Sequence, residues 1–240
     1  PGANQLTLSG GNASSIFHFY QINAAINRLT IANANGPSGA INNDQSNLTL
    51  NDCTVSHNMG GAFGGILVTE GSLTLNNCTV SHNTGRNGGG ILTFPIPGFS
   101  ASQITINSCT TSDNTATNGN GGGIYNDSGS VAINNSTISD NSASQAGGGI
   151  YNKSAMTLNN CTVSNNTASG EGGGIHNGAN ANLIVTNSTI TGNRCGANAA
   201  NLGGGISMNG TETLNNSIIA GNFQGSGTDP DDLVGTADNA

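Results

Sequence analysis

Residues 73–83 read LTLNNCTVSHN, and closely related stretches of eleven residues recur along the chain. The aligned copies begin at Leu48, Leu73, Ile104, Val131, Met156, Leu183 and Glu212, and a degenerate copy surrounds Leu29. From Leu48 onward the copies start 25, 31, 27, 25, 27 and 29 residues apart. A sequence period of this size indicates a repeat protein built from stacked equal units.

Each repeat contains three short stretches in which apolar and polar residues alternate, for example residues 90–92, 104–106 and 109–112. A period of two predicts β-strands, and Gly and Asn interrupt every stretch that would otherwise suit a helix. The crossover rule for parallel strands favours a right-handed path. We therefore predict an all-β fold, a single-stranded right-handed parallel β-helix (solenoid) of about eight to nine coils with three short strands per coil.

The columns of the repeat predict which side chains face the interior. Positions one, three, six and eight are small or apolar and are expected to stack inward on their own kind, whereas the Thr and Ser of positions two, seven and nine face solvent. The central Asn-Asn pair predicts a sharp corner, because Asn tolerates the left-handed backbone conformation. The last position predicts a second corner with a ladder of stacked side chains. Its members are Asn58, Asn83, Asn114, Asn141, Asn166, Asn193 and Asn222.

Glycine and cysteine also recur once per coil. A Gly-Gly-Ile triplet such as residues 89–91 has no helix after it, so it predicts positive φ or close backbone approach at a third corner rather than a phosphate loop. Four of the five cysteines share position six with Ser, which predicts free buried thiols. Cys195 lies outside that column, in residues 194–202, and is expected to be an exposed free thiol or to form an intermolecular bridge.

Composition excludes several classes of partner. Lys and Arg number four, the net charge is −8 and charged residues make up 7%, so a nucleic-acid partner is not expected. No apolar run has the length of a membrane span, no CxxC or Cys-His spacing predicts a zinc site, and no cofactor is expected. We predict one continuous domain over residues 1–240, forming a segment of a longer chain, with residues 223–240 leaving the last coil.

Residues 149–152 read GIYN and residues 158–166 read LNNCTVSNN. These units resemble the right-handed parallel β-helix repeats of bacterial surface proteins: the polymorphic-outer-membrane-protein-like repeats and large secreted proteins that carry such coils before a C-terminal anchor. Residues 1–10 and 216–222 are similar to the second group. The resemblance covers nearly the whole chain and implies an extracellular or cell-surface location. The Phe-x-x-Asn signature of the first group does not occur.

Position ten of the repeat supplies the first candidate binding residues. Its consecutive members are His57, His82, Asp113 and Asp140. Imidazoles and carboxylates about 5 Å apart on adjacent coils are able to bind a metal or to act as acid and base. The alternative is a solvated turn position at which any polar residue serves.

Two further surfaces are candidates for binding. Tyr125, Tyr151 and His176 form a column that is either a sugar platform or edge packing under a loop. The Thr-x-Ser pairs of positions seven and nine form a hydroxyl array that suits ice or glycans, although Thr and Ser are also ordinary outward strand residues. The insertion at residues 94–102 carries Phe94, Ile96 and Phe99, which predict a contact patch or a loop folded back on the coil.

The regular repeat, with no convergent catalytic cluster, favours a non-enzymatic extracellular structural or adhesive module, namely a stalk or a self-assembling filament subunit of a bacterial surface. One alternative is a carbohydrate-active enzyme resembling polysaccharide lyases or hydrolases. Another is a binding module that uses the hydroxyl face. Coil ends leave backbone groups unpaired, and no cap is recognisable at Pro1 or after Asn222, so we expect end-to-end self-association or contacts with cell-surface glycans.

Overall fold

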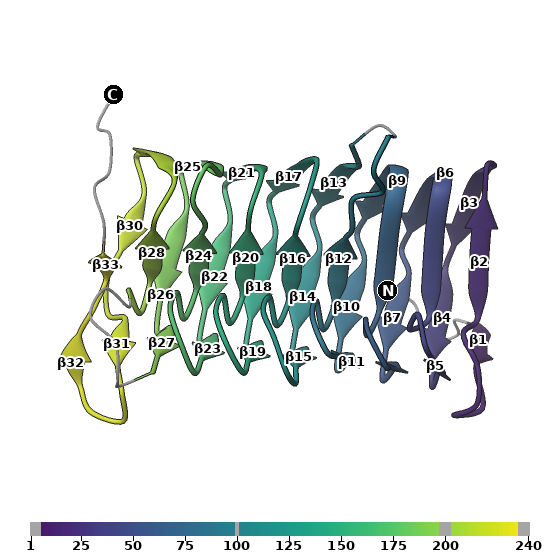
Figure 1. Ribbon diagram of the computed structural model, residues 1–240, viewed down its shortest axis with the longest axis horizontal. Coiled ribbons are helices and arrows are strands. Elements are labelled where there is room, and N and C mark those ends of the chain that lie inside the picture. The colour runs from purple at the N-terminus through teal and green to yellow at the C-terminus, as the bar shows by residue number, and fades with distance from the viewer. Residues whose placement is uncertain (1–5, 99–100, 197–202, 235–240) are drawn as a thin grey trace.

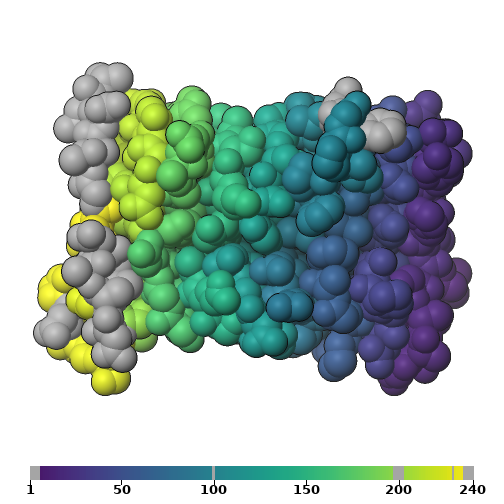
Figure 2. Space-filling view, viewed as in Figure 1, coloured from purple at the N-terminus to yellow at the C-terminus, as the bar shows by residue number. Residues whose placement is uncertain are grey.

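The computed structural model describes residues 6–98, 101–196 and 203–234. Over these ranges the chain winds into a β-solenoid whose coils follow one another along a single axis (Figure 1). Strands form three sheets, and the described residues contain no helix. In the space-filling view the successive coils form bands across a filled rod (Figure 2). The predicted all-β solenoid is therefore confirmed.

Sheet A contains one short strand from each coil. Within the described ranges its nine strands are separated by eight turns of the chain, and every pairing is parallel and in register. In order they are β1 (Leu6–Ser9), β4 (Leu29–Ala32), β7 (Thr54–Ser56), β10 (Thr79–Ser81), β14 (Thr110–Ser112), β18 (Thr137–Ser139), β22 (Thr162–Ser164), β26 (Thr189–Thr191) and β30 (Ile218–Ile219).

Sheet B is the largest of the three sheets that the described residues form, with 15 strands. A pair of short strands from each coil forms most of it, and the long strands β6 and β9 replace the pair in two early coils. The strands are β2 (Phe17–Tyr20), β3 (Asn23–Asn27), β6 (Ile41–Asn51), β9 (Ile66–Asn76), β12 (Ile91–Thr93), β13 (Gln103–Asn107), β16 (Ile124–Asn126), β17 (Ser130–Asn134), β20 (Ile150–Asn152), β21 (Ala155–Asn159), β24 (Ile175–Asn177), β25 (Asn182–Thr186), β28 (Ile206–Met208), β29 (Thr211–Asn215) and β33 (Leu233–Val234).

Sheet C consists of two-residue strands, and β8 to β31 in it each follow a ladder Asn. They are β5 (Asn35–Gly36), β8 (Met59–Gly60), β11 (Thr84–Gly85), β15 (Thr115–Ala116), β19 (Ser142–Ala143), β23 (Thr167–Ala168), β27 (Arg194–Cys195), β31 (Phe223–Gln224) and β32 (Asp229–Pro230). Residues 90–92 and 104–106 do not mark separate sides, because β12 and β13 pair with opposite halves of β9. The third side is sheet C, whose strands are too short to show an alternation in sequence.

The core is a set of aliphatic columns. Position-one side chains from Leu48 to Leu183 are at most 2% exposed, and each is paired in register with its counterpart in the next coil. Positions three and eight are buried in the same way, as shown by Leu75 and Val80, both 0% exposed. This arrangement confirms the inward stacking predicted from the repeat, and each coil buries its apolar face only against its neighbours.

Both kinds of corner predicted from Asn and Gly are present. The second residue of the Asn-Asn pair has positive φ, as at Asn77 (φ 53°) and Asn160 (φ 56°). At the third corner Gly88 has φ 51°, and a Cβ added to Gly90 would lie 2.6 Å from the carbonyl oxygen of Gly123. A contact this short leaves no room for a side chain, so both reasons proposed for glycine apply at this corner.

The predicted asparagine ladder is confirmed and runs through the interior. Nδ2 of Asn114 donates to the carbonyl of Val80 at 2.9 Å and to Oδ1 of Asn141 at 3.0 Å. Oδ1 of Asn114 accepts from the backbone N–H and Nδ2 of Asn83, both at 3.0 Å. All seven ladder residues are at most 1% exposed, and the same bonds recur at each step from Asn58 to Asn222.

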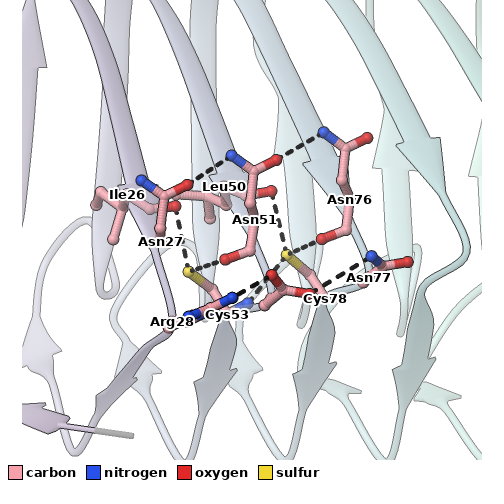
Figure 3. Close-up of polar contacts among 10 residues, drawn as sticks. Ile26, Asn27, Arg28, Leu50, Asn51, Cys53, Asn76, Asn77 and Cys78 are labelled. Atoms are coloured by element: carbon pink, nitrogen blue, oxygen red, sulfur yellow. Dashed lines mark hydrogen bonds and ion pairs between the residues drawn. The ribbon is translucent and has the colours of Figure 1, made fainter. Parts of the chain in front are cut away.

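The cysteine column closes the corner between sheets B and A (Figure 3). Sγ of Cys78 accepts from the backbone N–H of Cys53 at 3.5 Å and donates to the carbonyl of Asn76 at 3.3 Å. In the equivalent place Oγ of Ser136 accepts from the N–H of Cys109 at 3.0 Å and donates to the carbonyl of Asn134 at 2.7 Å. The position needs a small side chain that both accepts and donates, which explains why Cys and Ser interchange. The predicted free buried thiols are confirmed.

Two expectations about the C-terminal part were wrong. Cys195 is 1% exposed, because it belongs to strand β27 and its side chain is covered by the last coil. Residues 223–234 do not leave the solenoid: β31 pairs in parallel with β27, and β33 pairs in parallel with β28. Between them β32 turns back antiparallel to β31 and covers the edge of sheet C. A cap therefore follows Asn222, while Pro1 and the rest of residues 1–5 lie outside the described ranges.

Candidate functional site

The position-ten column lies at the corner that follows sheet A. His57, His82, Asp113 and Asp140 all have left-handed backbones, with φ from 55° to 58°. Asn165 (φ 56°) and Gly192 (φ 68°) occupy the same position in later coils. Gly favours this conformation, and Asn, Asp and His are the residues that tolerate it best, so the turn itself accounts for the residue types in the column.

The two histidines of this column lie against one another. The ring centroids of His57 and His82 are 4.8 Å apart, their planes differ by 6°, and both side chains are exposed. In the described ranges no three His, Cys, Asp or Glu side chains gather closely enough to hold a metal ion. The structure thus brings the histidines together as a stacked pair, with Asp113 and Asp140 following in the next two coils.

The aromatic column lies on the outer face of β16, β20 and β24. The ring of Tyr151 stacks on His176 with centroids 4.7 Å apart and planes 8° from parallel. Tyr125 meets Tyr151 edge to face, with centroids 4.9 Å apart. The rings therefore pack on each other along the rod axis and do not lie side by side with free faces. Leu67 and Leu92 continue the column and are buried, 5% and 1% exposed.

Polar groups surround this aromatic column on two sides. Asp127 accepts from the hydroxyl of Tyr125 at 3.3 Å and forms a close ion pair with Lys153. Burial, followed by the charge of Asp127, raises the pKa of Tyr125 to about 12. The hydrogen bond to Asp127 raises the pKa of Lys153. These contacts connect the rings to the turns that follow β16 and β20. The charges of Asp127 and Lys153 therefore help to hold these turns in place.

His176 has a carboxylate beside it. Its Nδ1 lies 3.3 Å from Oε2 of Glu171, and the same oxygen accepts from Oγ of Ser207 and Nδ2 of Asn209, each at 3.2 Å. Burial lowers the pKa of His176, and the charge of Glu171 opposes that effect. Because the side chain of His176 is 9% exposed, it is available to little besides its neighbours in the column.

A second buried ladder was missed in the sequence. Thr93 donates to Oδ1 of Asn126 at 3.0 Å, Nδ2 of Asn126 to Asn152 at 2.8 Å, and Nδ2 of Asn152 to Asn177 at 2.7 Å. Asn177 then donates to Oε1 of Glu212 at 2.7 Å. The sequence feature that could have predicted this ladder is the Asn two residues after Ile in each Gly-Ile-x-Asn unit. The period of two in a strand places this Asn on the same inward side as Ile.

The hydroxyl array follows sheet A in strict register. Its first column is longer than the repeat alone suggested, because Thr7 and Thr30 precede Thr54 on paired strands. Most of these threonines are half-buried and Thr110 is exposed, whereas Ser56 and Ser81 of the second column are 6% and 8% exposed. Within the insertion, Phe94 is 46% exposed and Phe99 lies outside the described residues.

Residues 41–223 match the family model described as a right handed beta helix region. The match covers most of the chain, so the chain belongs to this β-helix family, and the predicted right-handed sense agrees with it. No curated protein and no solved structure matches the chain significantly. Among the described residues, none forms a helix with the length and hydropathy that a membrane crossing requires.

Proposed function

We propose that this chain is a non-enzymatic structural module, a rigid β-helix rod that serves as a stalk or adhesive segment outside a bacterial cell. The observation that carries the proposal is the buried amide ladder from Asn58 to Asn222, which repeats the same corner in each coil that it crosses. Each rung adds roughly 4.8 Å, so eight turns hold the two ends roughly 40 Å apart. The sequence resemblance to bacterial surface repeats supports the location.

Stiffness in this rod comes from bonds shared by adjacent coils. Each ladder amide ties its own coil to both neighbours, and the outer amides of Asn51 and Asn76 do the same at the surface, where Nδ2 of Asn76 donates to Asn51 at 2.8 Å (Figure 3). Bending the rod opens backbone and side-chain bonds together on one side. A spacer that holds a partner at a fixed distance needs this property.

The test is to find where the protein lies and whether it acts on polymers. Immunogold labelling of intact source cells with antibodies to this chain is expected to decorate the outer surface, and a panel of acidic and neutral polysaccharides is expected to show no cleavage. Labelling confined to the cell interior contradicts the location. Reproducible cleavage that is lost in a variant such as Asp113→Asn contradicts the non-enzymatic role and favours the carbohydrate-active alternative.

Self-association is the second part of the proposal. The first coil carries exposed Leu6, Tyr20 and Ile22 (73%, 53% and 48%), whereas β32 with Pro230 covers the edge of sheet C at the other end. Proline has no N–H to offer to another strand. Pairing of two copies through their first coils fits this asymmetry better than an open filament. Sedimentation over a concentration series is expected to show a dimer that Leu6→Lys weakens; a monomer throughout contradicts this part.

The hydroxyl face of sheet A supports a second candidate function, contact with ice or a glycan. The favouring observation is the register of its threonines, which stand over one another from Thr7 to Thr189. Inhibition of ice recrystallisation and binding to a glycan array test it. Thr137→Tyr places a bulky ring in the middle of the face and is expected to abolish either activity; an unchanged signal excludes this face.

A further inference from the structure

We propose that His57 and His82 form a two-imidazole clamp for a divalent transition-metal ion, with Cu²⁺ as the best-suited probe. The proposal is independent of the structural role above. Both residues have φ 55°, and each donates its backbone N–H to the carbonyl of the strand in the next coil at 3.2 Å, His57 to Ser81 and His82 to Ser112. Two identical backbones one coil apart deliver their side chains in the same direction.

The distance between the rings suits a shared ligand. The ring centroids are 4.8 Å apart and the ring planes differ by 6°, so a turn of each ring is able to bring one nitrogen from each to a common ion. Metal–nitrogen bonds of about 2.0–2.1 Å at a right angle require nitrogens about 2.9 Å apart, which is less than the 4.8 Å between the ring centroids, so binding requires the rings to turn toward each other. The terminal torsion of His is broad, and both side chains are exposed, so the rings are free to turn toward a common ion.

The surroundings favour a cation of this kind. Asp113 and Asp140 continue the column beyond His82, and the chain has a net charge of −8. Imidazole suits Cu, Ni and Zn, and Cu²⁺ binds most tightly among the divalent first-row ions. The clamp supplies two nitrogens, and water completes the coordination, which is consistent with the absence of a three-residue cluster in the described ranges.

The column itself provides a matched control. Asn165 occupies the same corner with φ 56°, so His57→Asn and His82→Asn restore a residue that the fold already uses there. His18, whose side chain is 58% exposed, is a histidine outside the column, and His18→Asn controls for binding to a single imidazole.

The experiment is a Cu²⁺ titration of the full chain at pH 7.5 by calorimetry, with electron paramagnetic resonance of the one-equivalent sample. We expect one site whose affinity falls at least about tenfold in either His57→Asn or His82→Asn, since each removes half of a chelate. The spectrum is expected to change from two nitrogen ligands to one, and His18→Asn is expected to leave both readouts unchanged. Circular dichroism verifies that the variants remain folded.

Two results overturn the proposal. One is wild-type protein that binds Cu²⁺ no more tightly than the double variant His57→Asn with His82→Asn. The other is a spectrum with a single nitrogen ligand that persists in each single variant, which assigns the ion to one histidine and not to the pair.

Discussion

Asn222 donates to the same carboxylate oxygen of Asp232 from its backbone N–H and from its Nδ2, both at 2.9 Å. Each earlier ladder Asn makes these two bonds to the amide oxygen of the Asn in the next coil, as Asn193 does to Asn222 at 3.0 and 2.9 Å. An ionised carboxylate accepts as an amide oxygen does but has no proton to donate to a further rung. Asp232 therefore ends the first ladder, as Glu212 ends the second.

Removing this terminal acceptor is expected to loosen the last coil. Asn222 is 0% exposed, so Asp232→Ala leaves two donors of a buried group unpaired, at a cost of about 1–3 kcal/mol in the free energy of unfolding. Asp232→Asn keeps an acceptor oxygen and is expected to lose less than half as much. Urea denaturation measures the difference, and limited proteolysis shows whether cleavage moves to residues 203–234. Equal stability of Asp232→Ala and wild type contradicts the capping role.

The middle of the ladder is expected to be more sensitive. Asn141 donates to the carbonyl of Thr111 and to Asn166, and accepts twice from Asn114. Asn141→Ala breaks all four contacts inside the core and is expected to cost about 3 kcal/mol or more. The control is Asn134→Ala, which removes a rung of the outer amide ladder and is expected to cost less than about 1 kcal/mol because water replaces the lost partner. Similar losses in both variants, measured by urea denaturation, contradict a special role for the buried ladder.

The features of this solenoid differ in how well the sequence alone predicts them. An eleven-residue unit with a fixed last Asn is enough to predict stacked coils, because a one-residue slip would turn every apolar side chain outward. The ladder that contains Asn126 was not predicted. The residue between Ile124 and Asn126 differs from one repeat to the next, so the unit was interpreted as the end of a strand. The contact between Asp232 and Asn222 was not predicted either, because the two residues are ten apart in a turn that lies outside the repeat pattern. The stacking of His57 on His82 depends on side-chain torsions that the period leaves open.

The cysteine column makes a prediction about interchangeable side chains. Sγ of Cys109 accepts from the N–H of Cys78 at 3.2 Å and donates to the carbonyl of Asn107 at 3.1 Å. Ser performs both tasks at residue 136, so Cys109→Ser is expected to change the free energy of unfolding by less than about 1 kcal/mol, whereas Cys109→Ala loses about 1–3 kcal/mol. Thermal and urea unfolding of the two variants provide the measurement. If Ala is tolerated as well as Ser, size alone governs the position.

His176 is expected to make stability depend on pH on the acid side. Burial lowers its pKa below the ordinary 6.5, so the fold favours the neutral imidazole. The contribution of neutral His176 to the free energy of unfolding is complete above pH 6.5. It is lost as pH falls below that value, because the unfolded chain takes up the proton more readily. His176→Tyr introduces the residue type that Tyr151 has in the neighbouring coil, and a Tyr does not titrate between pH 5 and pH 7.5. The free energy of unfolding of this variant, relative to wild type, is therefore expected to rise as pH falls from 7.5 to 5.

Glu171→Gln provides the control for the His176 prediction. It removes the carboxylate that lies 3.3 Å from Nδ1 and opposes the effect of burial. Protonated His176 then lacks its partner, so the acid loss of stability is expected to become steeper than in wild type. An acid dependence that is the same in all three proteins assigns it to other groups.

Cys195 gives the corresponding prediction on the alkaline side. Burial, followed by the hydrogen bond to Oδ2 of Asp231 at 3.3 Å, raises its pKa from 9.0 to about 12. The fold favours the neutral thiol, so the stabilising contribution is complete below about pH 9 and is lost as pH rises from 9 toward 12. Cys195→Ser does not titrate in this range, and the stability difference between it and wild type is expected to narrow between pH 8 and pH 10.5. A disulfide-exchange reagent at pH 8 is expected to react with Cys195 only after denaturant is added, because the thiol is 1% exposed. Rapid labelling of the folded chain at this residue, identified by mass spectrometry, would contradict the burial of Cys195 and support the exposed thiol that the sequence predicted.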